Sequence, residues 1–222
     1  MKLLPIIVYI ASMLALSACA GALPDRPSPS PARSSELPRS GTSIAGSEEA
    51  RQCLAALQTA QVRFTPLPDR QFGGGCSAFN SVKLLDIGTP VTNIGAMTCP
   101  LAKNFAAWAR YGVQPAARQI MGSEVVRIES YGTYSCRAIA GSTKISEHAH
   151  SNAIDIASFV LANGDRISVK DGWRGDEQQS RFLRVVHQSA CKRFKTALGP
   201  DYNRAHEDHL HFDMGGAGGF CR

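Results

Sequence analysis

Apolar residues recur at two different periods along the chain, and these periods predict which segments are helices and which are strands. Three segments carry apolar residues three or four positions apart, the spacing of one helix face: the segment from Glu48, residues 100–111 and residues 176–198. Ser47 is placed to cap the first helix, Gly112 to close the second, and Gly199-Pro200 to stop the third. Three other segments are rich in strand-forming residues: 62–67, 124–131 and 153–159. Because helices and strands do not alternate regularly, we expect an α+β fold.

The N-terminus follows a different pattern, with Lys2 leading an apolar run from Leu3 to Leu16. That run is too short to span a bilayer, which needs about 20 apolar residues, and it fits the apolar core of a secretory signal. It ends in Leu-Ser-Ala-Cys at residues 16–19, which resembles the lipobox of bacterial lipoproteins. The resemblance implies a lipoprotein signal peptide at 1–18, removed before a lipidated Cys19; the alternative is an ordinary signal peptide. With Ala20 next, it also implies an anchor at the bacterial cell envelope, on the periplasmic side of the outer membrane.

Proline and serine dominate residues 19–47, which we interpret as a tether that follows the lipidated cysteine. A segment of this composition cannot bury enough apolar surface to fold by itself. The folded domain is expected at 48–222.

Seven cysteines are many for a chain of 222 residues in a reducing compartment. With Cys19 assigned to lipid, six remain for three disulfides: Cys53, Cys76, Cys99, Cys136, Cys191 and Cys221. Six cysteines allow about 15 pairings, among which the sequence does not choose. We therefore expect a single disulfide-stapled α+β domain with a small antiparallel sheet flanked by helices.

The net charge of +6 narrows the choice of partners. A basic chain is attracted to anionic polymers such as the cell wall. Nucleic acid is also anionic, but the export signal and the absence of basic residues interleaved with aromatic residues argue against nucleic-acid binding. The expected partners are peptidoglycan and, through the N-terminal lipid, a membrane.

Five of the six histidines lie in two short stretches, 148–150 and 206–211. Imidazole nitrogens and carboxylate oxygens are good ligands for Zn²⁺, and a catalytic zinc site uses three of them while leaving a fourth position open. His148 and His150 are two residues apart, so on an extended segment both would point the same way, and the same holds for His209 and His211. Chemistry alone does not select three ligands from this set.

The first stretch belongs to a longer motif from Ser146 to Asp155, with the sequence SEHAHSNAID. It is similar to the S-x-H-x-x-G-x-A-x-D signature of zinc D-Ala-D-Ala carboxypeptidases and related murein endopeptidases, and the later H-x-H at 209–211 is similar to the second motif of that superfamily. Over residues 50–213 the chain resembles the bacterial extensin-like C-terminal domain family. This match is carried by the YSCR segment at 134–137, by the SEH segment and by the terminal HLHFD.

The resemblance implies one zinc ion bound by His148, Asp155 and His211. It places Asp208 and His209 next to the last ligand, where one of them acts as the base, and we favour His209 with Asp208 orienting it. Arg137 corresponds to an arginine that holds a substrate carboxylate or carbonyl.

One residue departs from the signature, because Ser151 replaces its glycine and lacks the freedom of glycine to take a positive φ. The hypothesis from the sequence is a zinc-dependent carboxypeptidase or endopeptidase acting on peptidoglycan stem peptides or cross-links. The alternative is a peptidoglycan-binding lipoprotein that keeps the metallopeptidase fold without cleaving, with His150 and His206 beside the metal ligands in either case.

Overall fold

The protein is described from a computed structural model, which describes residues 47–222. The predicted signal peptide, Cys19 and the tether up to residue 46 lie outside the described residues. None of the helices in the described part of the chain has the length and apolar character needed to cross a membrane.

The first helix, α1 (Glu48–Thr59), begins where the sequence predicts it. The Ser47 hydroxyl accepts a hydrogen bond from the Ala50 amide at 3.1 Å, which satisfies one of the free amides of the first turn. Leu57 is fully buried, so the apolar stripe of this helix faces the core. The N-cap prediction is therefore confirmed.

The second helix, α2 (Cys99–Trp108), does not close at Gly112. It continues through two π-helical turns, Ala109–Val113 and Ala117–Met121, on either side of α3 (Gln114–Ala116), and ends at Gly122 with φ 64°. Gly112 has a different purpose: a Cβ there would lie 2.3 Å from the Ser189 hydroxyl of the facing helix. The glycine allows close helix packing rather than ending the helix.

The third predicted helix is shorter than its pattern suggests. Helix α5 (Glu177–Cys191) is capped by Asp176, whose carboxylate accepts from the Gln179 amide at 3.0 Å. The prediction of helix as far as Leu198 is wrong, because Thr196–Leu198 forms strand β10 between β11 (Leu210–Asp213) and β12 (Phe220–Cys221). Pairing on both sides of β10 outweighs the local helical period.

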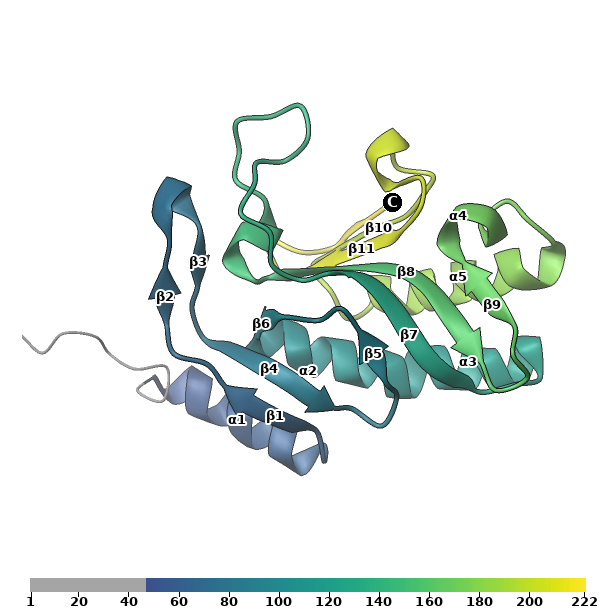
Figure 1. The fold of residues 1–222 in the computed structure, drawn as a ribbon, viewed down its shortest axis with the longest axis horizontal. Helices are drawn as coiled ribbons and strands as arrows, with labels where there is room; N and C mark the ends of the chain where they lie inside the picture. The colour runs from purple at the N-terminus through teal and green to yellow at the C-terminus, as the bar shows by residue number, and fades with distance from the viewer. Residues whose placement is uncertain (1–46) are drawn as a thin grey trace, which may run out of the picture. The chain divides into compact units, whose positions relative to one another are not determined.

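The strands form three sheets (Figure 1). The largest has the order β12-β10-β11-β8-β7-β5, with β9 also pairing with β8; its remaining strands are β5 (Val91–Thr92), β7 (Val125–Gly132), β8 (Ala153–Leu161) and β9 (Arg166–Ser168). A three-stranded sheet contains β1 (Arg63–Pro66), β4 (Ser81–Asp86) and β6 (Ala96–Thr98), and a hairpin contains β2 (Arg70–Gln71) and β3 (Ser77–Ala78). The central pairings are antiparallel, while β10–β12 and β5–β7 are parallel. The predicted α+β fold and its three predicted strands, now β1, β7 and β8, are confirmed.

Helices α2 and α5 cover one face of the largest sheet, and the short helix α4 (Val169–Gly172) follows β9 (Figure 1). Trp108 of α2 packs against Phe212 and Phe159 of the sheet, with ring centroids 5.0 and 6.1 Å apart. Phe182 of α5 packs edge-on against Phe159 at 5.2 Å. The apolar side chains of the central strands pack against the helices on this face, so the polar side chains of these strands lie on the opposite face.

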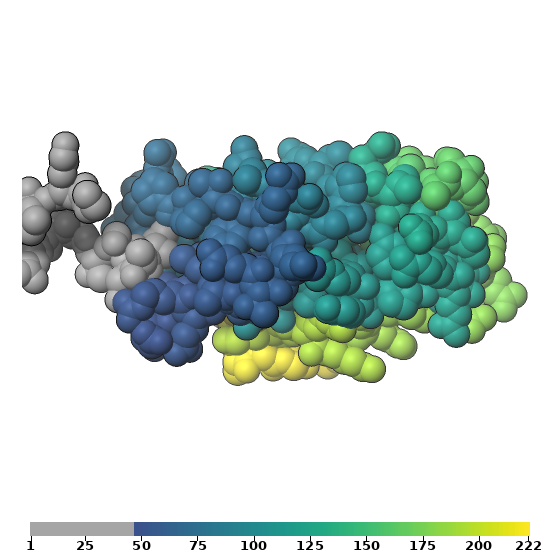
Figure 2. Space-filling model, turned by 90° about the horizontal axis from the view of Figure 1, so that it is seen from below, coloured from purple at the N-terminus to yellow at the C-terminus, as the bar shows by residue number. Residues whose placement is uncertain are grey.

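The six cysteines form three disulfides, as predicted, and the structure supplies the pairing: Cys53–Cys99, Cys76–Cys136 and Cys191–Cys221. The first joins α1 to the start of α2, and from below the blue residues of α1 lie beside teal residues of the following helical stretch (Figure 2). The second joins the β2–β3 hairpin to the loop after β7, and the third joins α5 to β12.

Candidate metal centre

The site is built on the pairing of two central strands. In the register of β8 with β11, Asp155 lies directly opposite His211. Side chains of a strand alternate between its two faces, so Leu210 and Phe212 enter the core while His211 takes the other face with Asp213. The predicted ligands Asp155 and His211 are thus cross-strand neighbours, although 56 residues separate them in the sequence.

The third predicted ligand comes from a tight turn just before β8. Residues Glu147–His150 form a 3-10 turn capped by the Ser146 hydroxyl. Ser151 then takes a left-handed conformation, φ 56° and ψ 24°, and redirects the chain into the strand. Its side chain is fully buried, and its hydroxyl has no hydrogen-bond partner among the described residues. The left-handed conformation that the signature glycine provides is therefore present here, adopted by a serine.

The turn and the strand pair bring three ligand atoms together. His148 Nε2 lies 3.1 Å from Asp155 Oδ1 and 3.1 Å from His211 Nδ1, and His211 Nδ1 lies 2.8 Å from Asp155 Oδ1. All three residues are at least nine-tenths buried. Ligand atoms about 2.1 Å from a tetrahedral metal would be about 3.4 Å apart, so only small side-chain adjustments separate this group from a zinc site.

Hydrogen bonds on the outer side of each imidazole determine which nitrogen faces inward. His148 Nδ1 donates to the Thr133 carbonyl at 2.9 Å, and His211 Nε2 donates to Asp213 Oδ2 at 2.9 Å. The other nitrogen of each ring, Nε2 of His148 and Nδ1 of His211, therefore faces the second ring and the Asp155 carboxylate. Three acceptors facing one another need a shared cation, and carboxylate or carbonyl partners of this kind are typical behind metal-bound histidines.

The electrostatics of the group favour that cation. Burial would lower the pKa of His211, but the carboxylates of Asp155 and Asp213 outweigh it and raise this pKa to about 9. Burial likewise opposes ionisation of Asp155, yet its close contacts with the His148 and His211 imidazoles hold its pKa well below the usual range. Without a metal, a proton on His211 is the positive charge that the site selects, and a metal ion would replace it.

His209 and Asp208 lie beside these three residues rather than among them. His209 Nδ1 donates to Asp208 Oδ1 at 2.8 Å, and its Nε2 lies 3.5 Å from Asp155 Oδ1. The Tyr131 hydroxyl donates to Asp208 Oδ2 at 3.4 Å, and its ring meets His209 edge-on at 5.9 Å. Sequence reasoning missed Tyr131, since a single tyrosine in a strand carries no signal that it reaches a histidine far along the chain.

The remaining clustered histidines separate. His150 does not point with His148 as an extended segment would require, because the 3-10 turn directs it to the Ser77 hydroxyl at 3.0 Å. His206 stays close, with its ring 5.7 Å from that of His211. Burial, and then the charges of His211 and His209, lower the pKa of His206 to about 4.

Arg137 lies in the loop that follows β7, next to the disulfide-bonded Cys136, and is exposed. Its positive charge is the smallest of the named causes that lower the pKa of His206. In the part of the chain that the structure describes, no carboxylate pairs with it.

A second set of metal-type side chains is formed by His187, Cys191 and Cys221. The two sulfurs are joined in a disulfide and so are not available as thiolate ligands. His187 is buried on α5, and burial lowers its pKa.

The fold and the site define a disulfide-bonded α+β domain with a buried His-Asp-His group of metal-binding type. The family model of the extensin-like protein C-terminus matches residues 51–222, and the chain belongs to that family. Comparisons with curated proteins and with solved structures find no match.

Proposed function

We propose that the protein is a zinc-dependent carboxypeptidase or endopeptidase that acts on the peptide stems or cross-links of peptidoglycan. The observation that carries the proposal is the group of three buried acceptor atoms on His148, Asp155 and His211, each turned inward by its surroundings. Disulfides already stabilise this domain, so a purely structural metal is less needed. The similarity of the motif to zinc peptidases of the cell wall supplies the substrate class.

The donor set fits zinc, since two imidazoles and a carboxylate are the kind of three protein ligands that a catalytic zinc takes. Bound there, zinc would polarise the scissile carbonyl and lower the pKa of a water molecule. The chain holds the ligands for this purpose from behind, since the Thr133 carbonyl orients His148 and Asp213 orients His211.

His209 is the residue that we assign to proton transfer. Its Nδ1 proton is held by Asp208, so the Nε2 lone pair is free to accept a proton on the side of the ligands and to return it to the leaving amine. Tyr131 donates to the other oxygen of Asp208 and so positions this pair. Asp208 acts as the orienting carboxylate and stabilises His209 when it is charged.

Arg137 is assigned to substrate binding. Its guanidinium is exposed and has no carboxylate partner in the described chain, and it suits a terminal carboxylate or a carbonyl. We further propose that a lipid on Cys19 and the tether keep this domain on the periplasmic side of the outer membrane, within reach of peptidoglycan.

The test uses the oxidised protein with purified muropeptides and a measured zinc content. We expect about one equivalent of zinc and cleavage products by mass spectrometry. His211→Ala should lose both zinc and cleavage. His209→Ala should keep zinc but lose at least about a hundredfold in turnover. His150→Ala is the matched control, since this histidine faces Ser77, and it should change neither.

Two results would contradict the proposal in different ways. A zinc content below a tenth of an equivalent after careful preparation would contradict the assignment of His148, Asp155 and His211 as zinc ligands. Full zinc occupancy with unchanged muropeptide profiles would instead favour a wall-binding protein without peptidase activity, because the metal group would then be present without turnover.

A further inference from the structure

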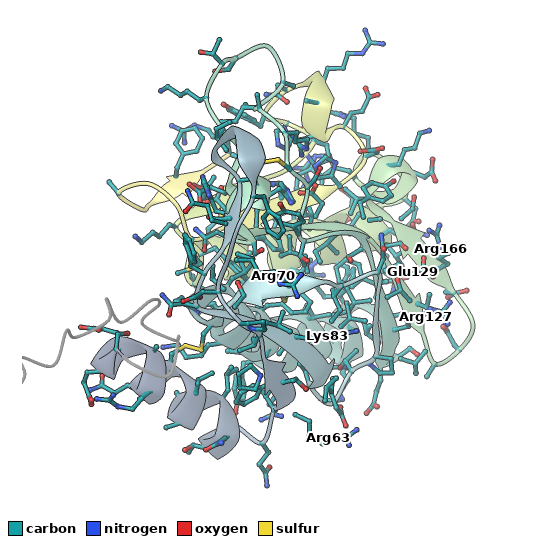
Figure 3. The ribbon with its side chains drawn as sticks, turned by 60° about the vertical axis from the view of Figure 1, so that its left-hand side comes forward. Arg63, Arg70, Lys83, Arg127, Glu129 and Arg166 are labelled. Carbon is teal, nitrogen blue, oxygen red and sulfur yellow. A yellow bond between two sulfur atoms is a disulfide. The ribbon has the colours of Figure 1, made fainter. Side chains whose placement is uncertain are left out.

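A cleft of about 1090 Å³ lies next to the metal centre and is not used by the assignments above. One wall is formed by the β2–β3 hairpin and by β4, and the other by β5 and the end of β7 (Figure 3). At that end, Tyr131 and Thr133 line the cleft and also contact the metal centre, through Asp208 and His148. The cleft and the metal centre therefore share a boundary.

The charged residues that line the cleft are mainly basic: Arg63, Arg70 and Lys83 face a single acid, Asp86. Arg63 is paired with Asp86 at 3.4 Å. Arg70 and Lys83 are exposed and have no carboxylate partner among residues 47–222. Two uncompensated positive charges on one wall of a concave surface attract anions more strongly than they would on a flat surface.

Strand β7 adds no uncompensated carboxylate to oppose the positive charges of Arg70 and Lys83. Glu129 is the only carboxylate on that strand, and it is already bonded to Arg127 and Arg166 (Figure 3). The Ser158 hydroxyl, and then Arg166 and Arg127, lower the pKa of Glu129 to about 2 despite its partial burial. Because two arginines compensate its charge, Glu129 adds no net negative charge to β7 beside the cleft.

The remaining lining suits a chain molecule rather than a small ion. Phe72 and Tyr134 lie with ring centroids 5.3 Å apart, and apolar side chains of β4 and β5 are part of the lining. Strand β5, which supplies Val91, stands at the end of the strand order of its sheet, so no strand of residues 47–222 pairs with its other side. A free strand edge is suited to the backbone of an extended peptide.

We infer that this cleft binds an acidic peptide segment, with its carboxylates on Arg70 and Lys83 and its backbone leading past Tyr131 toward the metal centre. The position of the segment relative to a cleaved bond rests on the proposed function, whereas binding itself does not. The cleft would then select substrates by the charge of residues away from the scissile bond.

The experiment measures binding without cleavage. The probe is a rhodamine-labelled Ala-Glu-Ala-Glu-Ala-Glu amide, and its neutral counterpart carries Gln in place of Glu. Fluorescence anisotropy is recorded with the full chain in mild detergent, with excess chelator so that no metal-dependent turnover depletes the probe. The test variant is Arg70→Gln with Lys83→Gln. The control, Lys103→Gln with Arg181→Gln, makes the same change in net charge at exposed positions outside the cleft.

We expect the acidic probe to bind about tenfold more weakly to the test variant than to the wild type or the control, and its binding to weaken with salt. The neutral probe should bind weakly to all three. Equal binding of the two probes, or equal loss in test and control variants, would overturn the inference, as would no detectable binding. An acidic trisaccharide, tri-galacturonate, that displaces the peptide at lower concentration than unlabelled peptide would assign the cleft to saccharide instead.

Separate muropeptide assays distinguish this inference from the proposed function. Loss of probe binding in the test variant, with no cleavage by the wild type, would refute the proposed peptidase activity and support peptide binding in the cleft. Cleavage by the wild type with unchanged probe binding in the test variant would refute the cleft alone.

Discussion

Replacing Ser151 by the glycine of the family signature should stabilise the protein. Ser151 combines two unfavourable features, a left-handed backbone at φ 56° and a buried hydroxyl with no hydrogen-bond partner. Its backbone is well held, since its carbonyl accepts from the Thr98 amide at 2.8 Å and its amide donates to the His148 carbonyl at 3.2 Å. Ser151→Gly should therefore keep the turn while removing both costs.

The magnitude follows from three contributions. A residue with a Cβ in the left-handed region costs about 1–2 kcal/mol, and an unsatisfied buried hydroxyl costs about 1–3 kcal/mol. The extra flexibility that glycine gives the unfolded chain opposes these by about 0.5–1 kcal/mol. We expect a net gain of about 1–4.5 kcal/mol in the free energy of unfolding, and each kcal/mol raises Tm by about 2–4 °C for a domain of this size.

The assay is thermal unfolding followed by circular dichroism, with disulfides intact and chelator present so that metal binding does not contribute to Tm. Ser151→Ala is the matched variant. It removes the hydroxyl but keeps the Cβ in the left-handed region, so its gain should be smaller than that of Ser151→Gly.

Two outcomes would refute parts of this reasoning. A Tm for Ser151→Gly at or below that of the wild type would show that the serine is not strained and that its hydroxyl is satisfied. Equal gains for the alanine and glycine variants would refute the backbone strain alone and leave the hydroxyl as the whole cost.

Three further predictions concern the metal centre, the dependence of stability on pH under acidic conditions, and a disulfide. Asp213→Asn should weaken zinc binding by about 10- to 100-fold, measured by competition with a chelator of known affinity, because it weakens the hydrogen bond that orients His211; unchanged affinity would contradict the role of this carboxylate. The pKa of Glu129 is lowered from 4.5 to about 2, so its contribution to stability is present above pH 4.5 and is lost as the pH falls toward 2. Glu129→Gln should therefore make urea midpoints less dependent on pH in that window, and an equal slope in both proteins would argue against it. Replacing Cys191 and Cys221 by alanine opens a loop of 30 residues and should cost about 3–4 kcal/mol in urea unfolding, whereas a loss below about 1 kcal/mol would be inconsistent with that loop entropy.

The helices and strands that the sequence predicts correctly are those whose pattern agrees with their packing. The stripe of α1 and the strand periods at β7 and β8 are local signals, and burial follows them. The errors occur where distant contacts decide. Gly112 reads as a helix terminator until Ser189 is placed against it, and residues 196–198 read as helix until β11 and β12 pair with them.

The candidate site shows the same division. Spacing identifies two histidine stretches, but the pairing of Asp155 with His211 depends on a strand register that no local pattern encodes, and only the motif resemblance anticipated that set. The direction of His150 was misjudged because an extended segment and a 3-10 turn place residues two apart differently. Tyr131 became visible only with the register of β7.

The Cys76–Cys136 disulfide lies outside the packed body of the domain and links two surface segments. It ties the hairpin that carries Arg70 to the loop that carries Arg137, while the other two disulfides join helices to their neighbours in the packed body. In a chain with this one pair still reduced, no covalent bond would hold the two cationic segments at a constant separation. Oxidation of this one thiol pair is therefore the step that fixes the Arg70 hairpin relative to the Arg137 loop.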